Sequence, residues 1–285
     1  MFLIALGLAG LIFGVGHSEV RKFENAAAKD IASRLSGDQK QVRVRTKLDP
    51  FEAMGGKVKS ATIFADHFTV DGLPFFTEPT GSKRGRLGEM KFEMSDFELT
   101  RLPVKTLRAR IPACRFDLGL AQRHGQIRLT ESGEGEGTVE VTGEGLAVFV
   151  KRKYPSIREI AIELVPGKAI LTGAGRFVVL DARFRIETQL GSVDGNQISM
   201  VEPKIWVNDQ LAEPGATKAI LSILNPVIDL DKDLKLYGAL RSKSVEIGNG
   251  SLIATGPAHI PLRPVGTVTL DSVFLRTISQ LLHAE

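Results

Sequence analysis

One pattern occurs twice in the chain, and it limits the possible fold more than any other feature. Residues 159–173 (EIAIELVPGKAILTG) and 243–256 (KSVEIGNGSLIATG) each run alternating apolar residues into a glycine-centred turn and return through a second apolar run. The turn dipeptides, Pro-Gly and Asn-Gly, are typical of hairpins, and Asn-Gly favours a type I′ turn. Residues 145–153 and 213–226 have helical spacing before each hairpin. We therefore expect a repeated unit of helix, short link and β-hairpin.

Pairing the arms outward from each turn gives both hairpins one wholly aliphatic face. Leu164 is then opposite Ala169 in the first copy, and Ile247 is opposite Leu252 in the second. The residues of the two aliphatic faces are Ile162, Leu164, Ala169 and Leu171 in the first hairpin and Val245, Ile247, Leu252 and Ala254 in the second.

The remaining segments predict a sheet with few helices. Residues 19–36 have helical spacing, whereas residues 42–48, 57–72 and 89–111 alternate as half-buried strands, with 57–72 expected to form a strand pair. Strands follow strands without regularly intervening helices, which indicates an α+β fold with a long antiparallel sheet. One long aliphatic face with few helices to cover it must close on itself or enclose something apolar.

The order of these segments resembles a known family. The segments are EVRKFENAAAKDIASRL, TVEVTGEGLAVFV before the first hairpin, and LNPVIDLDKDLKLYGALRSKSVEIGNGSLIATG, all within residues 19–260. Together they resemble the LmeA-like phospholipid-binding proteins of the bacterial envelope, which are related to the tubular lipid-binding (TULIP) folds. The resemblance implies a strongly curved antiparallel β-sheet wrapped around amphipathic helices. It also implies an aliphatic tunnel for acyl chains and no shared catalytic residues.

The eight residues of the aliphatic faces are therefore the candidate lipid-binding residues. The expected function is non-catalytic binding, and possibly transfer, of phospholipid at the cell envelope. A closed core without a ligand would leave the same pattern in the sequence, and the protein would then have a structural role in the envelope. The residues alone do not decide between the two.

The first sixteen residues carry no charged side chain, a run shorter than a bilayer span and closer to a signal-peptide core. We expect residues 1–18 to be an export signal or an uncleaved anchor, which predicts a location in the cell envelope. Residues 19–264 are expected to form the lipid-binding domain, and residues 265–285 a helical tail.

A second surface is expected to dock on a membrane. Two adjacent phenylalanines lie near three cations in a segment rich in turn-forming residues, a composition suited to an anionic lipid surface. Phenylalanines tucked under their own loop are the alternative. The docking candidates are Leu73, Phe75, Phe76, Lys83, Arg84 and Arg86.

No pattern of residues indicates an enzyme, a metal site or a cofactor. The five histidines stand singly, and the single Cys114 excludes an intramolecular disulfide. Residues 229–233 (DLDKD) resemble the start of a calcium loop, but the required glycine and final glutamate are missing, so a solvated acidic turn is expected. A net charge of +4 with one Trp and two Tyr argues against nucleic acid. The expected partners are phospholipid and an anionic membrane surface, with protein partners unknown.

Overall fold

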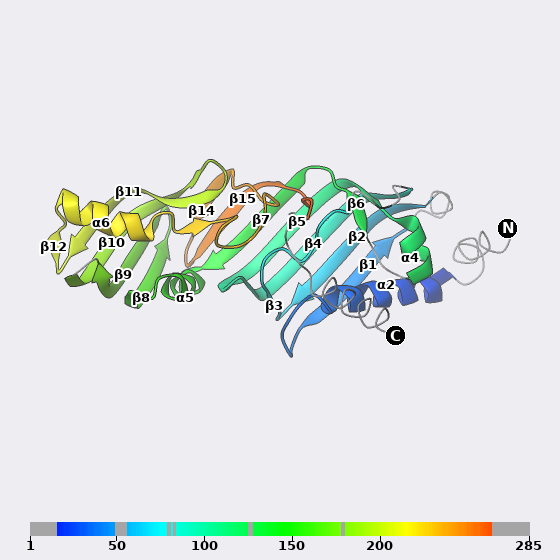
Figure 1. Cartoon of the computed structure of the whole chain (residues 1–285), viewed down its shortest axis with the longest axis horizontal. Helices are drawn as coiled ribbons and strands as arrows, with labels where there is room; N and C mark the ends of the chain where they lie inside the picture. Colours follow the sequence, from blue (N-terminus) through cyan, green and yellow to red (C-terminus); the bar gives the residue numbers. More distant parts are fainter. Residues whose placement is uncertain are drawn as a thin grey trace, which may run out of the picture.

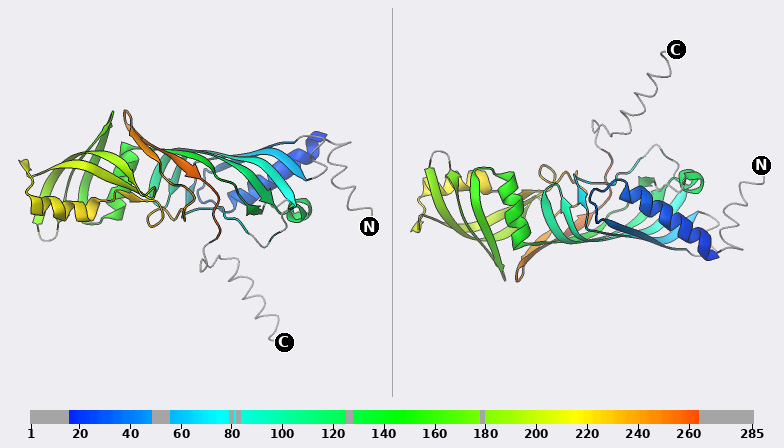
Figure 2. Two further views of the ribbon diagram at one scale, coloured as in Figure 1. Left: turned by 90° about the horizontal axis from the view of Figure 1, so that it is seen from above. Right: turned by 90° about the horizontal axis from the view of Figure 1, so that it is seen from below.

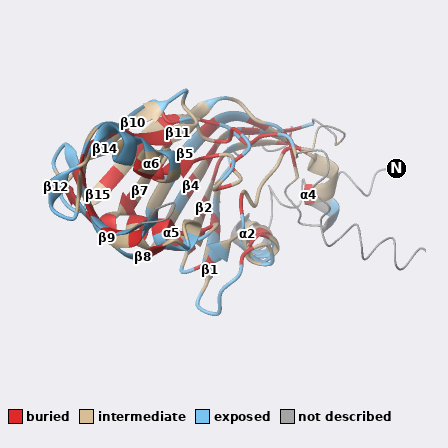
Figure 3. Cartoon of the chain, turned by 60° about the vertical axis from the view of Figure 1, so that its left-hand side comes forward, coloured by how far each residue is buried: buried red, intermediate tan, exposed pale blue. Residues whose placement is uncertain are grey.

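The protein is a mixed α+β molecule, mostly of strands, with two curled sheets arranged end to end along its long axis (Figure 1). The computed structural model describes residues 16–48, 56–78, 81, 84–124, 128–177 and 180–263. Buried and exposed residues alternate along many of the strands (Figure 3). Each sheet therefore has an inner face that contributes to the core and an outer face toward solvent.

The larger sheet contains nine strands within the described residues. In hydrogen-bonded order these are β1 (Gln41–Lys47), β2 (Lys57–Asp66), β4 (Gly85–Leu99), β5 (Leu102–Phe116), β7 (Gly135–Thr142), β15 (Ser251–Ala258) and β14 (Ser244–Ile247), with β3 (Thr69–Val70) beside β4 and β6 (Leu129–Glu131) beside β5. Most neighbours are antiparallel. Strands β2 and β3, however, both run parallel to β4.

The smaller sheet contains six strands in the same described ranges. Their order is β12 (Gln210–Leu211), β11 (Gln197–Val207), β10 (Leu180–Val193), β9 (Lys168–Phe177) and β8 (Ile157–Val165), with β13 (Ile228–Asp229) beside β11. The helices described are α2 (Gly16–Ala32), α4 (Leu118–His124), α5 (Gly143–Lys153) and α6 (Pro214–Leu224). Figure 2 shows α2 along one side of the larger sheet and α6 beside the smaller sheet.

The repeated hairpins form with the predicted register. Leu164 pairs with Ala169 in β8–β9, and Ile247 pairs with Leu252 in β14–β15. The predicted type I′ turn is wrong, because that turn needs positive φ at both central residues. Gly250 has φ of 80°, but among the described residues Asn249 is not one with a positive φ.

The two hairpins also join the two sheets. The backbone N–H of Gly167 donates to the carbonyl oxygen of Ile247 at 2.9 Å, and the N–H of Gly250 donates to that of Leu164 at 2.8 Å. Each turn glycine thus bonds to the residue three positions before the other turn glycine. The copies meet reciprocally where β8, an edge of the smaller sheet, approaches β14, an edge of the larger one.

Helix α2 covers the edge of the larger sheet at β1. Ala27 and Ile31 are buried against the sheet, as their helical spacing predicts. Glu24 accepts hydrogen bonds from the backbone N–H of Thr46, at 2.6 Å, and from its hydroxyl, at 2.9 Å. This contact satisfies a donor on a strand edge that would otherwise be open to pairing. The helix ends at Ala32, earlier than predicted.

Two further expectations about chain organisation are wrong. Residues 57–72 do not form a strand pair, because β2 and β3 bond separately to β4 and not to each other. The second repeated unit has no short link, because residues 225–243 separate α6 from β14 and include β13. In the first unit only residues 154–156 separate α5 from β8.

The DLDKD segment is a hydrogen-bonded turn and not a solvated one. Asp229 is 4% exposed, and its Oδ1 accepts from the backbone N–H groups of Asp231, at 3.2 Å, and Lys232, at 2.9 Å. The side chain of Gln197 donates to its Oδ2 at 3.0 Å. Burial opposes the charged carboxylate, but these hydrogen bonds outweigh it and lower the pKa of Asp229. The carboxylates here fold the turn.

Candidate functional site

An apolar cavity of about 140 Å³ lies inside the curl of the larger sheet. Strands β4, β5, β7 and β15 form its wall, and residues 228–242 and 73–75 close it from the other side. Apolar side chains that line the cavity are Phe68, Val70, Leu73, Phe75, Phe92, Met94, Phe97, Leu99, Leu102, Val104, Leu107, Ile111, Val139, Val141, Ile198, Ile228, Leu230, Leu234, Leu236, Leu240, Leu252 and Ile260.

Strand alternation and aromatic contacts give this cavity its shape. Phe92 and Met94 are two residues apart on β4, so both point to the inner face of the curl. The rings of Phe68 and Phe97 stack with centroids 4.7 Å apart and planes at 9°. Phe75 meets Phe92 at 5.5 Å between centroids. The interior is a hydrocarbon surface without a cluster of polar groups for catalysis among its described side chains.

Residues 230–242 form the roof of the cavity and carry no helix or strand. Lys235 bonds to Asp71 at 2.6 Å, and the backbone N–H of Gly238 donates to Asp231 at 2.7 Å. Lys153 of α5 reaches Asp233 at 2.5 Å. Burial lowers the pKa of Lys153, whereas its hydrogen bonds to Asp233 and Tyr154 raise it. The hydrogen bonds outweigh burial, so the net shift of the pKa is upward. Polar contacts at the rim therefore hold the roof in place.

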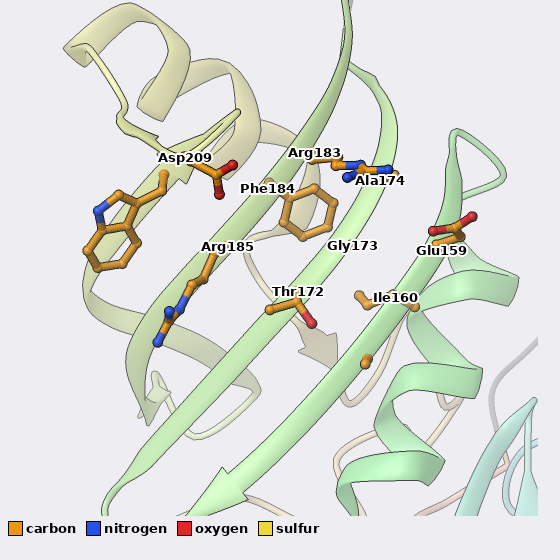
Figure 4. A pocket seen from close by; sticks show the side chains of 11 residues that line it. Glu159, Ile160, Thr172, Gly173, Ala174, Arg183, Phe184, Arg185 and Asp209 are labelled. Carbon is orange, nitrogen blue, oxygen red and sulfur yellow. The ribbon is translucent and has the colours of Figure 1, made fainter.

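A larger hollow, of about 450 Å³, lies on the outer face of the smaller sheet (Figure 4). Its floor contains Gly173, and Arg183 and Arg185 stand beside it, with Arg185 5.8 Å from the ring of Trp206. Both arginines are exposed. Hydrocarbon bound here would stay in contact with water, so little hydrophobic free energy would be gained. The smaller interior cavity is therefore the candidate site.

The structure separates the eight predicted lipid-binding residues. Leu252 and Ala254 of the second hairpin line the cavity. Val245 and Ile247 are half-buried and pack against the core. The residues of the first hairpin do not line the cavity; they are buried in the core of the smaller sheet and are Ile162, Leu164, Ala169 and Leu171.

The docking candidates are also divided. Leu73 and Phe75 line the cavity. Phe76 packs on Tyr237 at 5.9 Å, with the guanidinium of Arg263 5.7 Å from its ring. Arg84 and Arg86 are exposed, and Lys83 lies outside the described residues. Both phenylalanines thus make ring contacts within the protein while remaining half-buried, and membrane docking through them stays a prediction.

Most of the cavity lining was not among the predicted site residues. Residues 92–99 and 102–111 alternate like the hairpins, but nothing local shows which alternating face borders the cavity. In the roof, Leu230 stands within the segment interpreted as an acidic turn, and Leu234 and Leu236 follow directly after it. The alternation of leucines and aspartates in this segment was the signal that one side of the turn faces the protein interior.

Metal and thiol chemistry can be assessed from the described residues. Within the described ranges, no group of three His, Cys, Asp or Glu side chains could hold a metal ion. Cys114 is buried, and burial raises the pKa of its thiol to about 11, which keeps it protonated and unreactive near neutral pH. Among the helices in the described part of the chain, none is long and apolar enough to cross a bilayer.

The comparisons with known proteins identify the family of the chain. Residues 23–256 match the model of the LmeA-like phospholipid-binding family. No curated protein and no solved structure matches the chain. The matched range contains both hairpins and every strand from β1 to β14. The chain therefore belongs to the LmeA-like phospholipid-binding family.

Proposed function

We propose that the protein binds phospholipid by enclosing its acyl chains in the apolar cavity of the larger sheet, and that it catalyses no covalent step. The observation that carries this proposal is a hydrocarbon-lined interior in a chain of a phospholipid-binding family. Binding would draw on the transfer of hydrocarbon from water to protein, at roughly 25 cal/mol per Å² of buried surface. The same chemistry would allow transfer of lipid between membranes.

The size of the cavity requires that it widen on binding. Its volume of about 140 Å³ is below the roughly 300 Å³ at which ligand pockets begin. Movement of the roof would break no sheet, because residues 230–238 make no ladder hydrogen bonds, but it would have to open the rim contacts of Lys153 and Lys235. If the roof does not move, the alternative of a closed core with a structural role in the envelope applies, and the small volume favours that alternative.

The finer assignment of the fold belongs to the same proposal. A TULIP-like tube, with its sheet wrapped around amphipathic helices and a helix–hairpin repeat, is supported by the two curled sheets and by α2 along the larger one. The reciprocal contact of the two hairpins supports a repeat of the hairpins alone, because the helices before them are connected by links of different length.

The direct test is lipid analysis of the protein purified from its own cells after fractionation. We expect it in the envelope fraction, because residues 1–18 are expected to export or anchor it, and we expect phospholipid to co-purify in stoichiometric amount. Protein that carries no lipid would contradict the binding proposal. Recovery from the cytoplasm with bound lipid would contradict only the location.

Docking on an anionic membrane is a further part of the proposed function. Of the docking candidates, the exposed Arg84 and Arg86 are placed to meet lipid phosphates. We expect the double variant Arg84→Gln, Arg86→Gln to pellet less with anionic vesicles and equally little with neutral ones. Replacing the exposed pair Arg43 and Arg45 by glutamine removes the same charge elsewhere and serves as the control. An equal loss in both variants would show that net charge alone, and not this surface, directs docking.

A further inference from the structure

A second cavity continues the apolar cavity along β4. It holds about 30 Å³ and is lined on β4 by Met90, whereas the next inward residues, Phe92 and Met94, line the larger cavity. Phe75 borders both cavities. The two spaces therefore adjoin at Phe75, and together they are called the path; α2 borders only the smaller of them.

The lining changes character at the smaller cavity. Besides apolar residues it contains Asp30 of α2, Arg34 just after that helix, Glu78 and Arg128. Arg34 bonds to Asp30 at 3.0 Å. Arg128 lies 3.5 Å from Oε1 of Glu78. Charged side chains thus close this end of the path. The side chains of Arg34 and Arg128 are both three-quarters buried.

Glu78 stands between two arginines at this end. Its Oε1 is 3.5 Å from Nη1 of Arg128 and 3.9 Å from Nη2 of Arg263. Charge-assisted bonds between arginine and a carboxylate are normally about 2.7–2.9 Å long. The carboxylate is therefore loosely held in a place where an anion meets two guanidinium groups.

We propose that this end of the path binds the phosphate of the phospholipid, which displaces the carboxylate of Glu78 from Arg128. The inference rests on the proposed function, because the acyl chains must occupy the apolar cavity for the phosphate to reach this point. A space of about 30 Å³ holds roughly one water, so the phosphate needs the place of Glu78. A phosphate offers oxygens that match the guanidinium fork of Arg128, and Arg34, just after α2, lines the same cavity.

The test compares two lipids with the same acyl chains, phosphatidylglycerol and diacylglycerol, by displacement of a fluorescent apolar probe. Arg128→Gln should weaken binding of phosphatidylglycerol roughly tenfold, the value of one charge-assisted hydrogen bond, and leave diacylglycerol unchanged. Glu78→Gln should strengthen binding of phosphatidylglycerol, because a competing anion is removed. The control is Arg110→Gln, which breaks a comparable pair with Glu89, at 2.9 Å, at a site where the arginine side chain is 68% exposed.

The outcomes separate this inference from the proposed function. Equal effects of Arg128→Gln on both lipids, or no effect on either, would overturn the phosphate site while leaving acyl-chain binding intact. A wild-type protein that binds neither lipid would refute the proposed function, and the phosphate site with it. Inorganic phosphate should not displace the probe, and displacement by it would mean a site for free anions. Melting temperatures show whether each variant is folded, and Arg128→Lys should retain part of the affinity.

Discussion

Replacing Ala254 with phenylalanine is expected to remove most of the co-purifying phospholipid from a protein that remains folded. Ala254 lies on β15, is 9% exposed and lines the apolar cavity. A phenyl ring there would occupy space that the acyl chains need. Because that space is already open in the structure, the ring should cost little of the strain that accompanies overpacking of a filled core. Lipid per mole of protein, measured by mass spectrometry after extraction, checks this prediction.

The matched control for this variant is Ala161→Phe. Ala161 is exposed on the outer face of β8, so the same substitution adds the same ring outside the cavity. Its lipid content should equal that of the wild type. If Ala254→Phe also retains the wild-type amount, the ligand does not occupy this cavity. If Ala254→Phe unfolds, the less bulky Ala254→Leu should strain the fold less, and its lipid content can be measured instead.

Replacing Ile162 with glutamate is expected to unfold the protein or to cost several kcal/mol of stability. If Ile162 and Val245 lined one tunnel from equivalent places, as expected of the candidate lipid-binding residues, both glutamate variants would stay folded and lose lipid, whereas in a closed core both would misfold. In the structure Ile162 is a buried core residue opposite Leu171, outside the cavity. Ile162 is only 9% exposed, so a carboxylate there would be largely cut off from water, and an unpaired charge in such surroundings is very unfavourable.

The equivalent change in the second hairpin should be milder. Val245 is half-buried, so water can reach a carboxylate at that position. Urea unfolding of both variants measures the difference, and Ile162→Val, which typically costs about 0.5–1.5 kcal/mol, is the control for lost packing alone. An Ile162→Glu protein as stable as the wild type but free of lipid would mean that the first hairpin does face the ligand.

The hairpin registers could be predicted because they depend on neighbouring residues alone. A turn dipeptide fixes where the chain reverses, and alternation on both arms then fixes the pairs, as Leu164 with Ala169 shows. The prediction for residues 57–72 failed for the opposite reason. Strands β2 and β3 both pair with β4, which lies further along the chain, and the sequence of residues 57–72 carries no signal for a distant partner.

The candidate site could be predicted only in part for a similar reason. Alternation identifies an apolar face but not what that face meets, so Leu171 and Leu252 look alike in the sequence. One lies in a filled core, and the other borders the cavity. The difference arises from the curvature of the larger sheet and from the roof at residues 230–242, which come together only in three dimensions.

The junction between the two hairpins has a consequence for how sequences of this kind can diverge. Both of its bonds join main-chain atoms, from Gly167 to Ile247 and from Gly250 to Leu164. Side chains at Leu164 and Ile247 can therefore be exchanged without loss of either bond. Gly167 and Gly250, with φ of 75° and 80°, favour glycine, and proline in place of either would also remove a donor. The side chains of the two hairpins can therefore change until their common sequence pattern is lost, while the main-chain bonds keep the two sheets in the same relative position.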